Sequence, residues 1–116
     1  MFYRYEIYDE DGFVGGLFRG AAYPLNEMYD KNKTDFKKLD ALLDELFDTH
    51  WLINPRLDDS TNMNFYFTEK GNERAKKFLG EIEKLLNTYG YRLVARTLES
   101  CMDTVYADAN QIAVRV

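Results

Sequence analysis

The only histidine and the only cysteine of this 116-residue chain, His50 and Cys101, are the one pair that could form a Cys–His nucleophile. Such a cysteine needs a neighbouring base or positive charge that stabilises its thiolate. Cys101 lies in the segment Glu99-Ser100-Cys101-Met102, which carries no basic residue. We therefore expect both residues to have structural roles, and we assign no catalytic residue. A single cysteine also excludes an internal disulfide.

Motifs for metals and phosphates occur only in incomplete form. A calcium loop of the EF-hand type needs glycine at its sixth position and glutamate at its twelfth. Read from Asp30, these positions hold Asp35 and Ala41, and a reading from Asp9 also fails. The glycine-rich stretch Gly12–Gly20 lacks the lysine and the hydroxyl residue of a phosphate-binding loop. We expect no metal and no cofactor.

The whole chain has a formal net charge of −5, and its acidic side chains are concentrated in the first half. One group is the predicted turn Asp9-Glu10-Asp11, and the other is Asp40, Asp44 and Asp48, which recur every fourth residue along a predicted helix. Like charges at this spacing slightly destabilise a helix, which makes them candidates for a functional surface. Such a surface would bind a protein with a basic patch and would repel nucleic acid. The alternative is a solvated polar face without a partner.

Glycines and the single tryptophan mark a second candidate region. Gly15 and Gly16 interrupt a predicted strand, and such a pair indicates a bulge or a segment that packs against bare backbone. Together with Trp51 they are candidates for a ligand pocket, although Trp51 also fits the role of a packing anchor. Gly80, beside the apolar stripe of a predicted helix, indicates a close approach of that helix to the sheet.

The first half of the chain predicts a hairpin followed by a helix. Alternating residues over Phe2–Tyr8 predict a strand with Tyr3, Tyr5 and Ile7 on one face. A turn leads to a second strand over Phe13–Arg19. Residues 20–34 are predicted as a connection, with one short helical turn from Pro24 to Tyr29 and a polar loop over residues 30–33. A long amphipathic helix is predicted over Asp35–Thr49, with Thr34 as its N-cap.

The second half predicts another long helix surrounded by strands. This helix begins after Thr68 and ends at Gly90, a typical glycine C-terminus. Predicted strands cover Met63–Phe67, Tyr91–Leu98, Thr104–Ala107 and Gln111–Val116.

The element order is therefore ββ-α-β-α-βββ. It predicts one α+β domain over residues 1–116, with a mainly antiparallel sheet of five to six strands and two long amphipathic helices packed on one face. The other face of the sheet would be exposed, or it would be covered by a partner. A homodimer could form there, since the chain contains nine tyrosines and eight phenylalanines.

Part of the sequence resembles a known family. The segment His50-Trp51-Leu52-Ile53, the later run Phe65–Phe67 and the following Thr68-Glu69-Lys70-Gly71 are similar to the second half of winged-helix regulators of the PadR or MarR kind. The similarity covers Phe36–Leu79. It implies a DNA-binding role. The helix in the recognition position, however, carries Asp40, Asp44, Glu45 and Asp48, where phosphate contact requires lysine and arginine.

The sequence favours a non-enzymatic binding or regulatory protein that acts through protein–protein contacts. By analogy, its profile is similar to that of small accessory or inhibitor proteins of bacteria, phages and mobile elements. The alternatives are a winged-helix-like DNA-binding regulator and a small-molecule-binding domain or unrecognised enzyme. The alternation of aromatic and charged residues in Met1–Tyr8 is unlike a signal peptide, and no apolar run reaches the ~18 residues of a membrane span. We therefore expect a cytoplasmic location without membrane contact.

Overall fold

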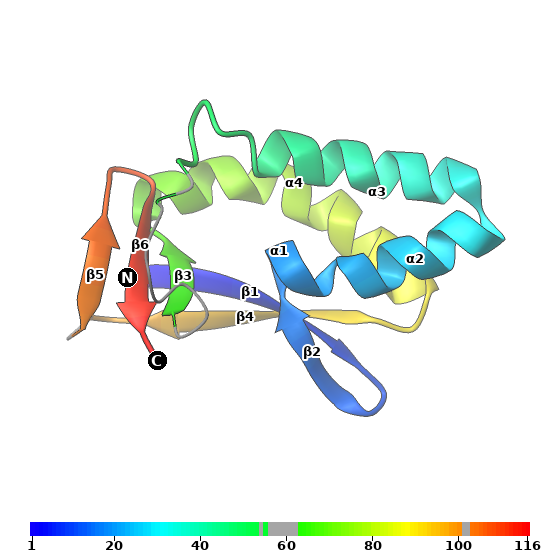
Figure 1. The fold of residues 1–116 in the computed structure, drawn as a ribbon, viewed down its shortest axis with the longest axis horizontal. Helices are drawn as coiled ribbons and strands as arrows, with labels where there is room; N and C mark the ends of the chain where they lie inside the picture. The colour runs from blue at the N-terminus through cyan, green and yellow to red at the C-terminus, as the bar shows by residue number, and fades with distance from the viewer. Residues whose placement is uncertain (54, 56–62, 101–102) are drawn as a thin grey trace.

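The computed structural model describes residues 1–53, 55, 63–100 and 103–116, and it shows an antiparallel sheet with helices on one side (Figure 1). The strands are β1 (Phe2–Asp9), β2 (Gly12–Gly16), β3 (Met63–Phe67), β4 (Arg92–Leu98), β5 (Thr104–Ala107) and β6 (Gln111–Arg115). The helices are α1 (Leu17–Gly20), α2 (Ala22–Lys31), α3 (Lys33–Leu46) and α4 (Glu69–Thr88). The predicted α+β class is confirmed.

Strand β1 is the centre of the sheet. One of its edges pairs with β4 along nearly the whole strand, and the other pairs with β2 and, at Tyr3, with β3. Strands β6 and β5 extend the sheet beyond β3, and these three strands run across β1 and β4 in Figure 1. The predicted alternation of β1 is confirmed, because the hydroxyls of Tyr3 and Tyr5 donate to Glu69 and Asn72 of α4 and Ile7 is fully buried.

Strand β2 is shorter than predicted, because the chain turns into α1 after Gly16. The glycine pair allows two segments of backbone to touch there. A Cβ atom on Gly15 would lie 3.1 Å from the Cα atom of Gly20. Leu17 and Ala21 then enter the core instead of continuing a strand. The pairing of β1 with β2 is irregular, as the glycine pair predicts.

The helical turn predicted from Pro24 to Tyr29 is confirmed, but it is part of a longer helix, α2, which replaces most of the connection predicted for residues 20–34. Pro24 and Met28 are buried on this helix, so its inner side belongs to the core. Only Asn32, which has extended backbone, separates α2 from α3. The two helices therefore form an antiparallel hairpin beside the sheet (Figure 1).

The predicted ends of α3 also need correction. The side-chain oxygen of Asn32 accepts hydrogen bonds from the N–H groups of Thr34 (3.1 Å) and Asp35 (3.2 Å). Asn32 is therefore the N-cap, in place of Thr34. The helix ends at Leu46, earlier than predicted, because Phe47 leaves helical geometry.

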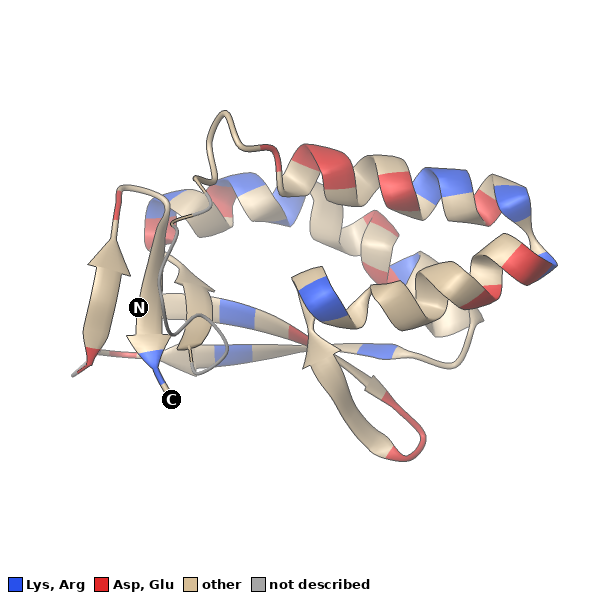
Figure 2. Cartoon of the chain, viewed as in Figure 1, with Lys and Arg blue, Asp and Glu red and all other residues tan. Residues whose placement is uncertain are grey.

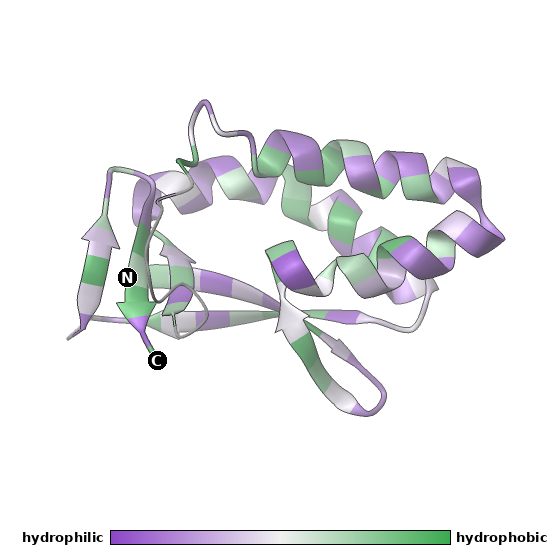
Figure 3. Ribbon diagram, in the orientation of Figure 1, coloured by the Kyte–Doolittle hydropathy of each residue, from purple (hydrophilic) through white to green (hydrophobic). Residues whose placement is uncertain are grey.

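Helix α4 lies on the sheet, and α3 packs on α2 and α4. Hydrophobic and hydrophilic residues alternate along both long helices (Figure 3). Their buried apolar side chains belong to one core cluster, which contains Leu39, Leu43 and Leu46 of α3 and Ala75, Ile82 and Leu86 of α4. Among the described helices, none is both long and apolar enough to cross a membrane.

The start of α4 is fastened to the turn between β5 and β6. The Thr68 hydroxyl accepts from the N–H of Gly71 (3.1 Å) and donates to the carbonyl oxygen of Ala109 (2.7 Å). A Cβ atom on Gly71 would overlap the carbonyl oxygen of Asn110. Gly80, where the sequence predicts a close approach, has no heavy atom within 4 Å of an added Cβ. That prediction is therefore wrong, and the close approach is at Gly71.

Candidate functional site

A shallow groove lies between α1, α2 and the second half of α3. Its volume is about 230 Å³, and its lining consists of Phe18, Ala21, Leu25, Asp40, Leu43, Asp44 and Phe47. The groove exists because residues 17–31 form helices and bring Phe18 beside Phe47. The two rings contact each other edge to face, with centroids 4.9 Å apart.

The apolar wall of this groove is open to solvent. Phe18 is 67% exposed, although it stands in direct contact with another aromatic ring. The Phe18–Phe47 pair is therefore accessible from solvent, beside the polar side chains of α3. The sequence pattern predicts a strand at Phe18 and gives no sign of its part in the groove. The signal that could have found it is the apolar pair Leu17 and Ala21, which has helical spacing.

Asp40 and Asp44 form the acidic wall of the same groove. Both are exposed, and neither forms an ion pair or a hydrogen bond with another described residue. They lie in the half of α3 that ends in the negative pole of the helix dipole, and the last turn carries no basic residue. Asp44 lies in this last turn, where a negative charge is disfavoured, and Asp40 is a like charge one turn before it.

Asp48 does not continue this acidic edge as the sequence predicts. It lies beyond the end of α3, and its carboxylate accepts a hydrogen bond from the N–H of His50 (2.8 Å). Its carbonyl oxygen accepts from Trp51 and Leu52. Asp48 therefore stabilises the turn after the helix, and the groove is lined by only two of the three predicted aspartates.

The acidic turn Asp9-Glu10-Asp11 is a separate feature. It lies at the tip of the β1–β2 hairpin, on the opposite edge of the molecule from α3 in the view of Figure 2. The Asp9 carboxylate accepts from the N–H of Asp11 (2.8 Å), and Gly12 follows with a φ of 122°. These contacts form the turn. The structure does not bring the two acidic groups together.

The three residues predicted for a ligand pocket have other contacts. Gly15 touches Gly20, and a Cβ atom on Gly16 would lie 2.6 Å from the guanidinium of Arg4. Neither glycine lines the groove described above.

Trp51 is buried between two side chains from distant parts of the sequence. Its ring stacks on Phe67 at 6.0 Å, and the guanidinium of Arg74 lies 4.6 Å from the ring centroid. Its carbonyl oxygen accepts a hydrogen bond from Asn110 (2.7 Å). Trp51 therefore joins α4 and the β5–β6 turn to the core, which is the packing role that the sequence leaves open.

The Cys–His pair considered from the sequence has only one member within the described part of the structure. His50 is exposed in the turn after α3, and Cys101 lies outside the described residues. Within residues 1–53, 55, 63–100 and 103–116, no group of three or more His, Cys, Asp or Glu side chains is placed to hold a metal ion.

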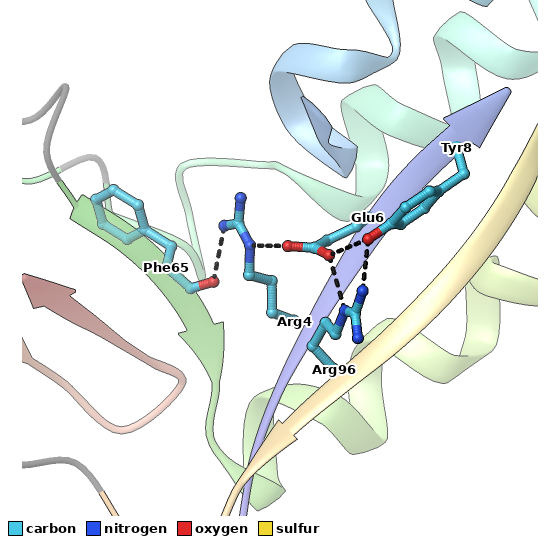
Figure 4. Close-up of polar contacts among 5 residues, drawn as sticks. All are labelled: Arg4, Glu6, Tyr8, Phe65 and Arg96. Carbon is cyan, nitrogen blue, oxygen red and sulfur yellow. Dashed lines mark hydrogen bonds and ion pairs between the residues drawn. The ribbon is translucent and has the colours of Figure 1, made fainter. Parts of the chain in front are cut away.

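The face of β1 that is turned away from the helices carries a network of paired charges (Figure 4). Glu6 accepts from Nε of Arg4 and from Nε of Arg96, both at 3.0 Å. Arg4 also donates to the carbonyl oxygen of Phe65, and Arg96 donates to the hydroxyl of Tyr8. Burial alone would raise the pKa of Glu6, but the hydrogen bonds from Arg96 and Arg4 outweigh it and hold the pKa below its usual value. Glu6 is therefore fixed between two arginines, one from each half of the chain.

The fold and the groove together define an α+β protein with an open apolar groove walled by unpaired carboxylates. No family model matches the chain, and neither a curated protein nor a solved structure matches it. The function is therefore inferred from these surfaces alone.

Proposed function

We propose that this protein is a non-enzymatic binding protein, and that the groove between α1, α2 and α3 receives a basic amphipathic helix of a partner protein. The observation that carries the proposal is the position of Asp40 and Asp44 on the wall of an exposed aromatic groove, without a charged partner among the described residues. A partner helix would place apolar side chains against Phe18 and Phe47, and lysine or arginine beside the two carboxylates.

The size of the groove supports a protein partner over a small molecule. Typical sites for small molecules have volumes of about 300–1,000 Å³ and enclose most of their ligand. This groove is smaller, at about 230 Å³, and it is shallow. It offers space for individual apolar side chains of a larger partner.

The charge of α3 favours a protein partner over DNA. In the winged-helix interpretation, α3 is the helix that approaches the phosphates. Its exposed Asp40, Asp44 and Glu45 would be repelled there. A basic protein surface would be attracted by the same charges. If this protein is an inhibitor, it would act by covering such a surface on its partner.

The test uses a synthetic peptide that places leucine at helical spacings of three and four, with lysine at the other positions. We expect binding that weakens with salt, measured by fluorescence anisotropy. The double variant Asp40→Lys/Asp44→Lys should weaken binding roughly 30-fold or more, because attraction is replaced by repulsion. Phe18→Ser should weaken it through the loss of apolar contact.

The matched control is Glu10→Lys/Asp11→Lys, which makes the same change in net charge at the hairpin tip. It should keep nearly full affinity, since this turn lies far from the groove. Equal loss of affinity in both double variants would show that only net charge matters and would reject the groove as the site. The same variants can then be tested for their ability to capture partner proteins from a cell lysate.

A further inference from the structure

Strand β4 is an exposed edge of the sheet. Its seven residues, Arg92–Leu98, pair with β1 and with no other strand in the described part of the chain. Along such an edge, alternate residues direct N–H and C=O groups away from the sheet, where another strand can pair with them. β4 is the longest of the described edge strands, since β2 has five residues and β5 has four.

A second groove runs beside this edge, under α4. It has a volume of about 170 Å³ and is lined by Tyr5, Leu79, Gly80, Glu83, Leu93 and Ala95. Ala95 points to the helix side, like its pairing partner Tyr5, yet it is exposed. The groove between α4 and β4 therefore leaves the Ala95 side chain uncovered at the edge of the sheet.

Gly80 keeps this space open. No heavy atom lies within 4 Å of a Cβ atom added there, so packing in the isolated chain does not require glycine. Glycine in a helix costs about 1 kcal/mol relative to alanine. A larger side chain would extend into the groove beside β4, and its absence leaves the groove free for an incoming strand.

The charges on the opposite face of β4 indicate which strand would fit. Arg92 and Arg96 both lie over the ring of Tyr8, with centroid distances of 5.7 and 5.8 Å. Arg96 is held by Glu6, whereas Arg92 has no carboxylate partner among the described residues. A second copy of β4 would bring further arginines to this face, and like charges across a strand pair are unfavourable. An incoming strand with carboxylate side chains on this face would instead be attracted to Arg92 and Arg96.

We propose that β4 accepts an extended segment of another protein as an additional strand, and that this segment alternates small apolar residues with acidic ones. The apolar side chains enter the groove under α4, and the acidic side chains lie beside Arg92 and Arg96. A shift of one residue would exchange the two faces, so the arginines also fix the register. This surface is separate from the α3 groove.

The test uses a capped peptide that alternates glutamate with valine, added to the full chain. We expect NMR shift changes at the β4 amides and slower hydrogen exchange along β4. Gly80→Leu, which fills the groove, and Arg92→Glu, which reverses the charge, should each weaken binding about tenfold or more. Gly80→Ala should keep the affinity, and a peptide that alternates lysine with valine should not bind.

Binding without protection of the β4 amides, or equal binding by Gly80→Leu and Gly80→Ala, would overturn the proposal. No binding of the glutamate–valine peptide at millimolar concentration would also overturn it. If the chain forms a concentration-dependent dimer that is lost in Gly80→Leu, the strand that pairs with β4 is a second copy of this chain, and the proposal of an acidic segment is rejected. Asp40→Lys/Asp44→Lys should leave this binding unchanged, so failure here and failure of the α3 groove can be distinguished.

Discussion

The groove at α3 and the outer face of β1 differ in whether their charged side chains are paired. Asp40 and Asp44 form no ion pair among the described residues, and Asp44 lies in the last turn of α3, whereas Glu6 is held by two arginines. Partnered charges can stabilise a fold, and unpartnered like charges at a helix end lower its stability. Surfaces that keep such a cost are often those that bind. The comparison predicts that removing the paired charge of Glu6 lowers stability, whereas removing the carboxylates of the α3 groove does not.

The largest expected effect on the stable side is at Gly71. Gly71→Ala places a Cβ atom onto the carbonyl oxygen of Asn110, and backbone cannot move aside as a flexible side chain can. We expect the free energy of unfolding to fall by about 3 kcal/mol or more, by overpacking and loss of the Thr68 cap. Chemical denaturation measures this change. Stability equal to that of the unmodified chain would show that the start of α4 is not fixed to the β5–β6 turn.

A smaller loss is expected at Glu6. Glu6→Gln removes the charge between Arg4 and Arg96 and should lower the free energy of unfolding by about 1–3 kcal/mol at neutral pH. The folded-state pKa of Glu6 is below its usual value. Its stabilising contribution is therefore complete above the unfolded-state pKa and is lost as the pH falls through the folded-state pKa.

The difference between the unmodified chain and Glu6→Gln should thus shrink on acidification, as measured by denaturation at several pH values. Glu10→Gln, at the exposed hairpin tip, is the control and should show no comparable difference. If the difference in the free energy of unfolding between the unmodified chain and Glu6→Gln stays constant down to acidic pH, the arginines do not stabilise the ionised carboxylate.

The sequence predicts local structure well where one pattern extends over many residues. The alternation of β1 and the helical stripes of α3 and α4 depend on periodic burial, and both patterns are present in the structure. Residues 20–34 are harder, because Pro24 predicts only a short helical turn and the polar residues that follow it are typical of a loop. Their helix is held by buried Met28, whose contacts come from other elements.

The two glycines of α4 show why the candidate sites are harder still. The sequence predicts close packing at Gly80 and none at Gly71. The structure shows the opposite, because the turn that meets Gly71 belongs to residues about 40 positions later in the chain. The α3 groove is similar: Asp40 and Asp44 are visible as a pattern, but Phe18 comes from a different helix and Asp48 is diverted into a turn.

The smallest expected change in stability tests the comparison between the α3 groove and the β1 face most directly, because it is a gain where the other variants lose stability. Asp44→Lys replaces an unpaired carboxylate by a cation near the negative end of α3, and it also removes the repulsion with Asp40. We expect the free energy of unfolding to rise by about 0.5–1 kcal/mol, as measured by chemical denaturation. Binding of the basic helix should weaken in the same variant. Glu10→Lys, outside any helix, should change stability little. If Asp44→Lys instead destabilises the chain, the carboxylate serves the fold, and the division between a stable sheet side and a binding groove does not hold.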